Sequence, residues 1–96
     1  MAFSLKLPKK LARQWAVKIR DRERVEPPHV TVLRKTQAWR LDLRTGEYMD
    51  KEPDPDDVPS AVRKCIDANW EVLREKWDEM YPENPVESDE EENSDD

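Results

Sequence analysis

The sequence predicts an α+β protein, in which a small antiparallel β-meander of three or four strands packs against one long C-terminal α-helix and a disordered acidic tail follows. Three observations support this class. Residues 29–43 are rich in β-branched and alternating apolar residues, residues 58–80 carry an apolar stripe with helical spacing, and the last ten residues are almost all acidic or polar. A sheet and a helix that each have one apolar face bury those faces against one another.

The first twenty residues support two interpretations. From Leu7 to Ile19, apolar residues recur every four positions, as in an amphipathic helix. Over residues 15–19 they also alternate with small or charged residues, as in a half-buried strand. We favour a strand over residues 14–20, preceded by an irregular segment or short helix over residues 1–13.

Two further strands follow a polar connection that ends in two prolines, Pro27 and Pro28. Proline lacks a backbone N–H and holds its predecessor in extended geometry, so this segment predicts a rigid approach to a strand. The run HVTVLRK, which starts at His29, predicts one strand, and the alternation over residues 38–43 predicts the next. Gly46, the only glycine, predicts a turn that requires a positive φ.

Residues 58–80 have the clearest periodicity in the chain. At about 100° per residue, the apolar side chains fill one arc and the charged side chains fill the other. Asp57 is the predicted N-cap, and Pro59 is tolerated in the first turn. Pro82 ends the helix. We expect one uninterrupted helix whose stripe covers the meander.

Charge is divided unequally along the chain. Residues 1–46 hold twelve Lys and Arg against four Asp and Glu, a net charge of +8. Residues 47–96 hold five basic and nineteen acidic residues, a net charge of −14. Such a division is typical of nucleic-acid binding, of binding to a charged protein, or of neutralisation within the fold or a dimer.

We expect a single domain over residues 1–82 and a disordered acidic tail over residues 83–96, because a block of like charges repels itself. The only cysteine, Cys65, excludes an internal disulfide and a multi-cysteine zinc site and fits a reducing compartment. No apolar run approaches the ~20 residues that span a bilayer, and the first residues lack the apolar core of a signal peptide. These features predict a soluble, cytoplasmic protein with no membrane association.

Two short motifs carry a resemblance to a known family, and their residues are Pro27, Pro28, His29, Val30, Ile66, Asn69, Leu73 and Trp77. Over about residues 14–81, the chain resembles a family of short prokaryotic proteins catalogued as domain of unknown function 4160. In that family a second histidine usually follows two residues after the first, where this chain has Thr31. The resemblance implies the same order of strands and helix and a bacterial or phage setting, with toxin–antitoxin or mobile-element neighbours. It implies no defined activity.

His29, the only histidine, is the first candidate for a chemical role. An imidazole titrates near neutral pH and can serve as a general base or a metal ligand. A zinc site takes three or four converging ligands, and the sequence shows no such spacing around His29 or Cys65. We therefore predict no catalytic residue, no metal and no cofactor, and regard His29 as a structural residue or at most a binding contact.

Asn69 is the second candidate, because it interrupts the apolar arc of the predicted helix. A buried amide without partners costs about 1–3 kcal/mol, so Asn69 must find hydrogen bonds. We expect it to be a structural residue that holds a neighbouring loop, around residues 27–29, against the helix.

A sheet covered on one side by a helix leaves its other face open, and four basic residues are expected there or at its margin: Lys18, Arg20, Arg34 and Arg40. Such a face can follow a phosphate backbone or receive an acidic protein. The predicted function is therefore a small cytoplasmic interaction module, toxin–antitoxin-like, that contacts nucleic acid or an acidic protein as a monomer or weak homodimer. The alternative is a small metal-assisted hydrolase or nuclease that uses His29.

Overall fold

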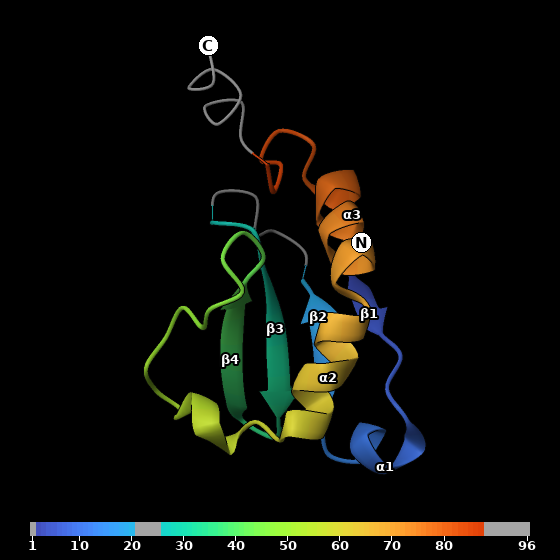
Figure 1. Cartoon of the computed structure of the whole chain (residues 1–96), viewed down its shortest axis with the longest axis vertical. Helices are drawn as coiled ribbons and strands as arrows, with labels where there is room; N and C mark the ends of the chain where they lie inside the picture. Colours follow the sequence, from blue (N-terminus) through green and yellow to red (C-terminus); the bar gives the residue numbers. More distant parts are fainter. Residues whose placement is uncertain (1, 21–25, 88–96) are drawn as a thin grey trace.

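The computed structural model describes residues 2–20 and 26–87, which form an α+β domain with a four-stranded antiparallel sheet (Figure 1). The strands lie in the sheet in chain order and are β1 (Phe3–Leu5), β2 (Ala16–Ile19), β3 (His29–Arg34) and β4 (Gln37–Asp42). The predicted α+β class and the antiparallel meander are confirmed. The part of the predicted disordered tail that follows Glu87 lies outside the described residues.

The register of the strands follows from their alternating sequences. Val17, Val32 and Trp39 lie opposite one another across three strands, and all three are buried. Because side chains alternate between the two faces of a strand, their sequence neighbours point to the other face. Between β3 and β4 a two-residue turn contains Lys35, which has a φ of 55°.

Residues 1–13, which we expected to be irregular or a short helix, contain strand β1 as well as a short helix, and a further strand follows as we favoured. Helix α1 (Lys9–Ala12) is a single turn that follows Pro8, and the Trp15 backbone N–H donates to the Leu11 carbonyl. The chain then enters β2 at Ala16, two residues later than expected. Trp15 is buried, so it anchors α1 to the end of the sheet.

The predicted long helix is wrong in one respect, because it is divided into α2 (Ser60–Ala68) and α3 (Trp70–Met80). The break is at Asn69, with φ −115° and ψ 22°. Its side-chain amide donates to the Cys65 carbonyl at 2.8 Å, so Asn69 satisfies the end of α2. Asparagine side chains compete in this way for backbone groups that a continuous helix would use.

The start of the helical segment also differs from the prediction. Asp57 belongs to a short 3₁₀ helix, η1 (Pro55–Asp57), and not to the helix cap. Pro59 occupies the N-cap position of α2, and no side chain caps that helix. Together α2 and α3 run along one face of the sheet (Figure 1). Their buried residues are Val62, Ile66, Leu73 and Trp77.

Residues 81–87 form a segment that we call the C-terminal strap, and it packs against the domain beyond the predicted boundary at residue 82. Val86 is 1% exposed, and its backbone N–H donates to Asp78 Oδ1 at 2.8 Å. Arg44 donates from Nε to the Val86 carbonyl at 2.7 Å and from Nη2 to the Pro85 carbonyl at 2.9 Å. The strap therefore belongs to the folded domain.

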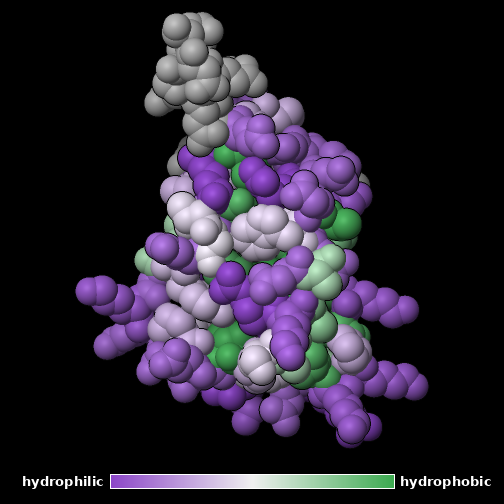
Figure 2. Space-filling model, in the orientation of Figure 1, coloured by the Kyte–Doolittle hydropathy of each residue, from purple (hydrophilic) through white to green (hydrophobic). Residues whose placement is uncertain are grey.

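The surface over α2 and α3 is mainly hydrophilic. Figure 2 shows purple residues over most of this face and hydrophobic residues only in small, separated patches. Within the residues that the structure describes, no helix is long and apolar enough to cross a membrane.

Candidate functional site

The helix-free face of the sheet holds two of the predicted basic residues, Lys18 and Arg40. Register pairs Lys18 with Thr31 and Thr31 with Arg40, so the three side chains form a row across β2, β3 and β4. Thr31 is 2% exposed. Arg20 follows the last residue of β2 and is exposed, and its carbonyl accepts a hydrogen bond from the Tyr81 hydroxyl. The face therefore brings together fewer cations than the sequence predicted.

Arg40 is engaged by two carboxylates. Its Nε and Nη2 donate to both oxygens of Asp50, at 2.9 and 2.8 Å, and its Nη1 donates to Glu26 Oε1 at 3.2 Å. The hydrogen bond and charge of Asp50 raise the pKa of Arg40, although burial acts in the opposite direction. The hydrogen bond from Arg40 lowers the pKa of Asp50 in turn. The charge of Arg40 is thus balanced within the domain.

The Arg40–Asp50 pair predicts a pH-dependent contribution to stability. Because the folded pKa of Asp50 is lowered, the contribution is present above its unfolded pKa, about 3.9, and is lost as pH falls through the folded pKa. The side chains are 38% and 32% exposed, so solvent screening limits the contribution to about 0.2–1 kcal/mol. We expect Asp50→Asn to lower the free energy of unfolding by that amount at neutral pH, measured by urea denaturation.

The same comparison at acidic pH serves as the control. As pH falls through the lowered folded pKa of Asp50, the carboxylate of the unsubstituted chain becomes protonated, so the stability of this chain and that of Asp50→Asn converge. A difference in stability that stays the same at neutral and at strongly acidic pH would contradict an ionic contribution from the pair.

The structure corrects the predicted place of Arg34. Arg34 lies on the same face of β3 as Val30 and Val32, which is the face covered by the helices and not the open one. Its guanidinium lies 4.9 Å from the ring centre of Trp15 and 5.9 Å from that of Trp39. Arg34 also donates to Gln37 Oε1 at 2.9 Å.

His29 is fully buried at the start of β3. Its Nδ1 lies 2.8 Å from the Pro27 carbonyl, which can only accept, so Nδ1 carries the hydrogen. The ring packs 5.6 Å from the ring of Trp77 on α3, and Nε2 lies 3.9 Å from Glu26 Oε1. These contacts give His29 a structural role between β3 and α3. Substrate would have to displace packed side chains to reach it.

Asn69 makes a side-chain hydrogen bond to the backbone, but its partner differs from the expected one. It binds the Cys65 carbonyl at the end of its own helix and not the loop over residues 27–29. Within the described residues, no group of three or more His, Cys, Asp or Glu side chains is arranged to hold a metal ion.

A shallow cavity of about 360 Å³ lies beside the turn at Gly46 and the junction of α2 and α3. The guanidinium groups of Arg44 and Arg63, which line this cavity, already donate hydrogen bonds within the domain. Arg63 donates to the Gly46 carbonyl at 2.9 Å and to Asp67 at 3.0 Å, and Arg44 holds the strap. Gly46 has a φ of 78°, as the turn prediction requires. We assign this cavity a structural role.

Five cations that the sequence interpretation did not group lie together at the end of the sheet where α1 and the β3–β4 turn meet. We call this surface the basic end, and its residues are Lys9, Lys10, Arg13, Arg34 and Lys35. All are exposed except Arg34, which is partly covered. Within the described chain, none of the five forms an ion pair, in contrast to Arg40, Arg63 and Arg74.

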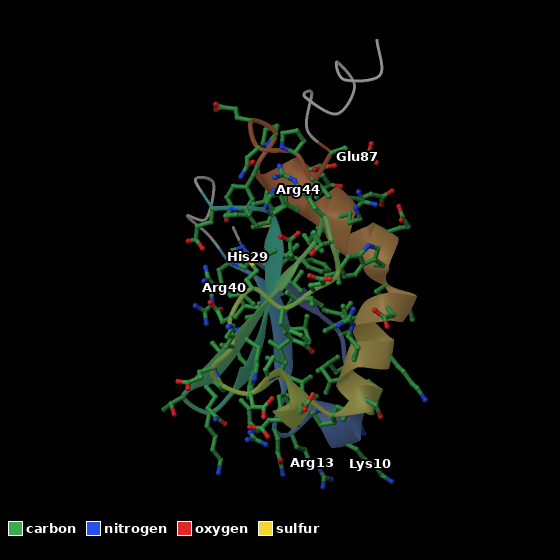
Figure 3. The ribbon with its side chains drawn as sticks, turned by 60° about the vertical axis from the view of Figure 1, so that its left-hand side comes forward. Lys10, Arg13, His29, Arg40, Arg44 and Glu87 are labelled. Atoms are coloured by element: carbon green, nitrogen blue, oxygen red, sulfur yellow. The ribbon has the colours of Figure 1, made fainter. Side chains whose placement is uncertain are left out.

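Trp15 joins the two parts of the basic end. Its backbone hydrogen-bonds to Leu11 of α1, and its ring lies beneath the guanidinium of Arg34. Figure 3 shows Lys10 and Arg13 at this end, pointing away from the domain. The acidic helix η1 lies at the same end of the molecule as α1 (Figure 1), and the Trp39 indole near Arg34 donates to the carbonyl of its N-cap, Asp54, at 2.9 Å. In the sequence, the pair Lys9–Lys10 and the nearby Arg13 indicate one part of this cluster. The position of Arg34 and Lys35 beside them follows only from the register of the strands.

Comparisons of the chain with protein-family models, with curated proteins and with solved structures found no match. The resemblance of residues 14–81 to the family catalogued as domain of unknown function 4160 stays a prediction. The assignment of function therefore depends on the geometry and charge of the described residues.

Proposed function

We propose that this protein is a small cytoplasmic binding module that contacts the phosphate backbone of a nucleic acid through the basic end. The observation that carries the proposal is the group of five cations without an ion pair on one end of the domain. Cations of this kind bind phosphates and release the counterions that surround a nucleic acid. Cations already paired with carboxylates gain less from a phosphate, because the existing pair must first be broken.

The shape of the basic end supports the same proposal. The Arg34 guanidinium lies near two indole rings and donates to Gln37 Oε1, so part of its conformational entropy is already lost before it meets a ligand. Lys35 adopts a positive φ, a conformation that costs residues other than glycine about 1–2 kcal/mol. Backbone strain of this kind tends to occur at functional sites.

Nucleic acid is favoured over an acidic protein because no large, exposed hydrophobic side chain lies among the described residues of the basic end. The core of a protein interface is typically apolar and aromatic. Among the described residues, the exposed large hydrophobic side chain is that of Val72, which lies on α3 and not at the basic end. Contacts to phosphates need only charge and hydrogen-bond donors. The toxin–antitoxin setting implied by the family resemblance is compatible with this proposal and is not required by it.

The test is the salt dependence of binding to labelled duplex DNA and single-stranded RNA. We expect log K to fall linearly with log salt, with a slope of about −0.9 per phosphate contacted on duplex DNA and about −0.7 on a single strand. The double substitution Lys10→Gln/Arg13→Gln is expected to reduce the magnitude of the duplex slope by about 2, since each cation accounts for about one contact.

A matched control is the double substitution Lys51→Gln/Lys64→Gln, which removes two charges from exposed residues outside the basic end. Its slope should equal that of the unsubstituted chain. Equal losses in both variants would show that total charge and not the basic end controls binding. Absence of binding at low salt, with and without the tail charges, would contradict the proposal and direct the search to an acidic protein partner.

A further inference from the structure

The net charge of −6 lies outside the described domain. Residues 2–20 and 26–87 contain fifteen basic and fifteen acidic residues, a net charge of zero. Residues 21–25 are also neutral, whereas residues 88–96 hold six acidic residues and no basic one. The domain and its tail therefore have separate electrostatic characters, and the tail is a purely acidic segment whose charge is opposite to that of the basic end.

The C-terminal strap determines where the tail leaves the domain. Besides the bonds from Arg44, the Trp77 indole donates to the Asn84 carbonyl at 2.7 Å, and the Asn84 amide donates to the Glu26 carbonyl at 2.7 Å. Glu87 therefore leaves from a fixed position. Figure 3 places Glu87 and Arg44 at one end of the molecule and Lys10 and Arg13 at the other.

This position opposes a return of the tail to the basic end of its own copy. Nine residues span about 30 Å when fully extended, whereas the long axis of the molecule measures 46 Å. A return along the full long axis exceeds the extended reach of residues 88–96. Even a shorter route would need an almost straight segment, and fixing each residue costs about 1–2 kcal/mol of backbone entropy. The basic end of a second copy can approach the tail without that restriction.

We propose that the acidic residues 88–96 of one copy bind the basic end of a second copy, in a head-to-tail arrangement. This inference rests on the basic end assigned under the proposed function, and it adds a second, competing ligand for that surface. The two contacting surfaces differ, so the association is heterologous, and every dimer keeps one unused tail and one unused basic end. The neighbour's tail occupies the surface that contacts phosphate and so restrains nucleic-acid binding.

Two variants of the full chain separate the two surfaces. The neutral-tail variant replaces the six tail acids by their amides: Asp89→Asn, Glu90→Gln, Glu91→Gln, Glu92→Gln, Asp95→Asn and Asp96→Asn. The basic-end variant carries Lys9→Gln, Lys10→Gln, Arg13→Gln and Lys35→Gln, all exposed positions whose side chains the fold does not use. Arg34 is kept because it packs on Trp15.

Sedimentation equilibrium measures the association. At about 0.01 M salt, where the Debye length is about 30 Å, we expect the mass of the unsubstituted chain to rise with concentration. It should start from the monomer value of 11.4 kDa. At about 1 M salt, where the Debye length is about 3 Å, the chain should be monomeric. Each variant alone should be monomeric in both conditions.

The decisive measurement mixes the two variants. The neutral-tail variant supplies only an intact basic end, and the basic-end variant supplies only an acidic tail. We expect the mixture to form a 1:1 dimer that does not grow further, because no second pair of intact surfaces is left. A monomeric unsubstituted chain at low salt would overturn the proposal, and so would association of either variant alone.

The outcome is independent of the nucleic-acid test. If the mixture dimerises but the neutral-tail variant does not bind nucleic acid, the proposed function fails and the self-association holds. If the neutral-tail variant binds nucleic acid and no dimer forms in the mixture, the reverse is true. If both hold, nucleic acid added to the mixture should dissociate the dimer.

Discussion

Replacement of Trp77 by alanine is expected to remove a large part of the free energy of unfolding of this domain. Trp77 is fully buried on α3, and its ring packs 4.3 Å from Tyr81 and 5.6 Å from His29. Removing a buried Trp side chain costs about 3–5 kcal/mol. A folded domain of this size has a total stability of roughly 4–13 kcal/mol. The loss therefore takes a large part of the available stability.

The indole of Trp77 also holds the C-terminal strap through its bond to the Asn84 carbonyl. Trp77→Ala thus weakens the packing of α3 against the strap, which is itself hydrogen-bonded to the segment before β3. For a domain of this length, each kcal/mol lowers Tm by about 4–8 °C, so we expect Tm to fall by at least about 12 °C. Circular dichroism during thermal and urea unfolding measures both quantities.

Trp70→Ala is the matched control, since Trp70 lies one residue after the break in the helix and is only partly covered. Its loss should be clearly smaller. Trp77→Phe should give an intermediate result, because it keeps an aromatic ring and leaves the Asn84 carbonyl without its donor. A loss in Trp70→Ala equal to that in Trp77→Ala would contradict the central place of Trp77 in the core.

Strands β2, β3 and β4 were predictable from the sequence because their physical signal is local, whereas β1 lies in a segment that we expected to be irregular or a short helix. A strand with one buried face requires apolar residues at alternate positions, and residues 15–19, 29–34 and 38–43 show that alternation directly. The same rule placed Val17, Val32 and Trp39 on one face. Each of these assignments needs only the geometry of a single strand.

The break between α2 and α3 was not predictable from periodicity. The apolar stripe continues across Asn69, from Ile66 to Leu73, so the pattern fits one helix. Whether the Asn69 amide faces solvent or bonds back to the Cys65 carbonyl is decided by packing against the sheet. The packing of the strap was not predictable from composition either, because Val86 is a single apolar residue within a strongly acidic segment.

The candidate surface was predicted in part. Arg34 alternates in phase with Val30 and Val32, so the sequence already contained the signal that places it on the covered face. The pairing of Arg40 with Asp50 depends on the path of the loop after β4, which no periodicity reports. The basic end combines residues from α1 and from the β3–β4 turn, and that juxtaposition exists only in the folded sheet.

Replacement of His29 by alanine is the second change for which we expect a large effect, and the expected effect is on stability. The imidazole is fully buried, bonded through Nδ1 to the Pro27 carbonyl and packed on Trp77. Removing it leaves a cavity beside Trp77 and removes the hydrogen bond to the Pro27 carbonyl. A large-to-small change in the core costs about 2 kcal/mol or more and a lost hydrogen bond about 0.5–1.5 kcal/mol, so we expect a loss of about 2–4 kcal/mol in urea unfolding.

His29→Asn separates the structural role of His29 from a chemical one. The asparagine amide can donate to the Pro27 carbonyl as Nδ1 does, so this variant should recover part of the stability that alanine loses. It has no titrating nitrogen and would not replace a general base.

If His29 were the centre of a metal-assisted hydrolase, both substitutions would abolish hydrolysis while the fold stayed intact. Divalent metal would then raise the Tm of the unsubstituted chain alone, because a ligand that binds only the folded state stabilises it. We expect instead that the same metal leaves all three Tm values in their original order, with alanine lowest and asparagine between alanine and histidine. That order follows from packing and hydrogen bonding alone, and it would place the function of this domain at its charged surface and not at its only histidine.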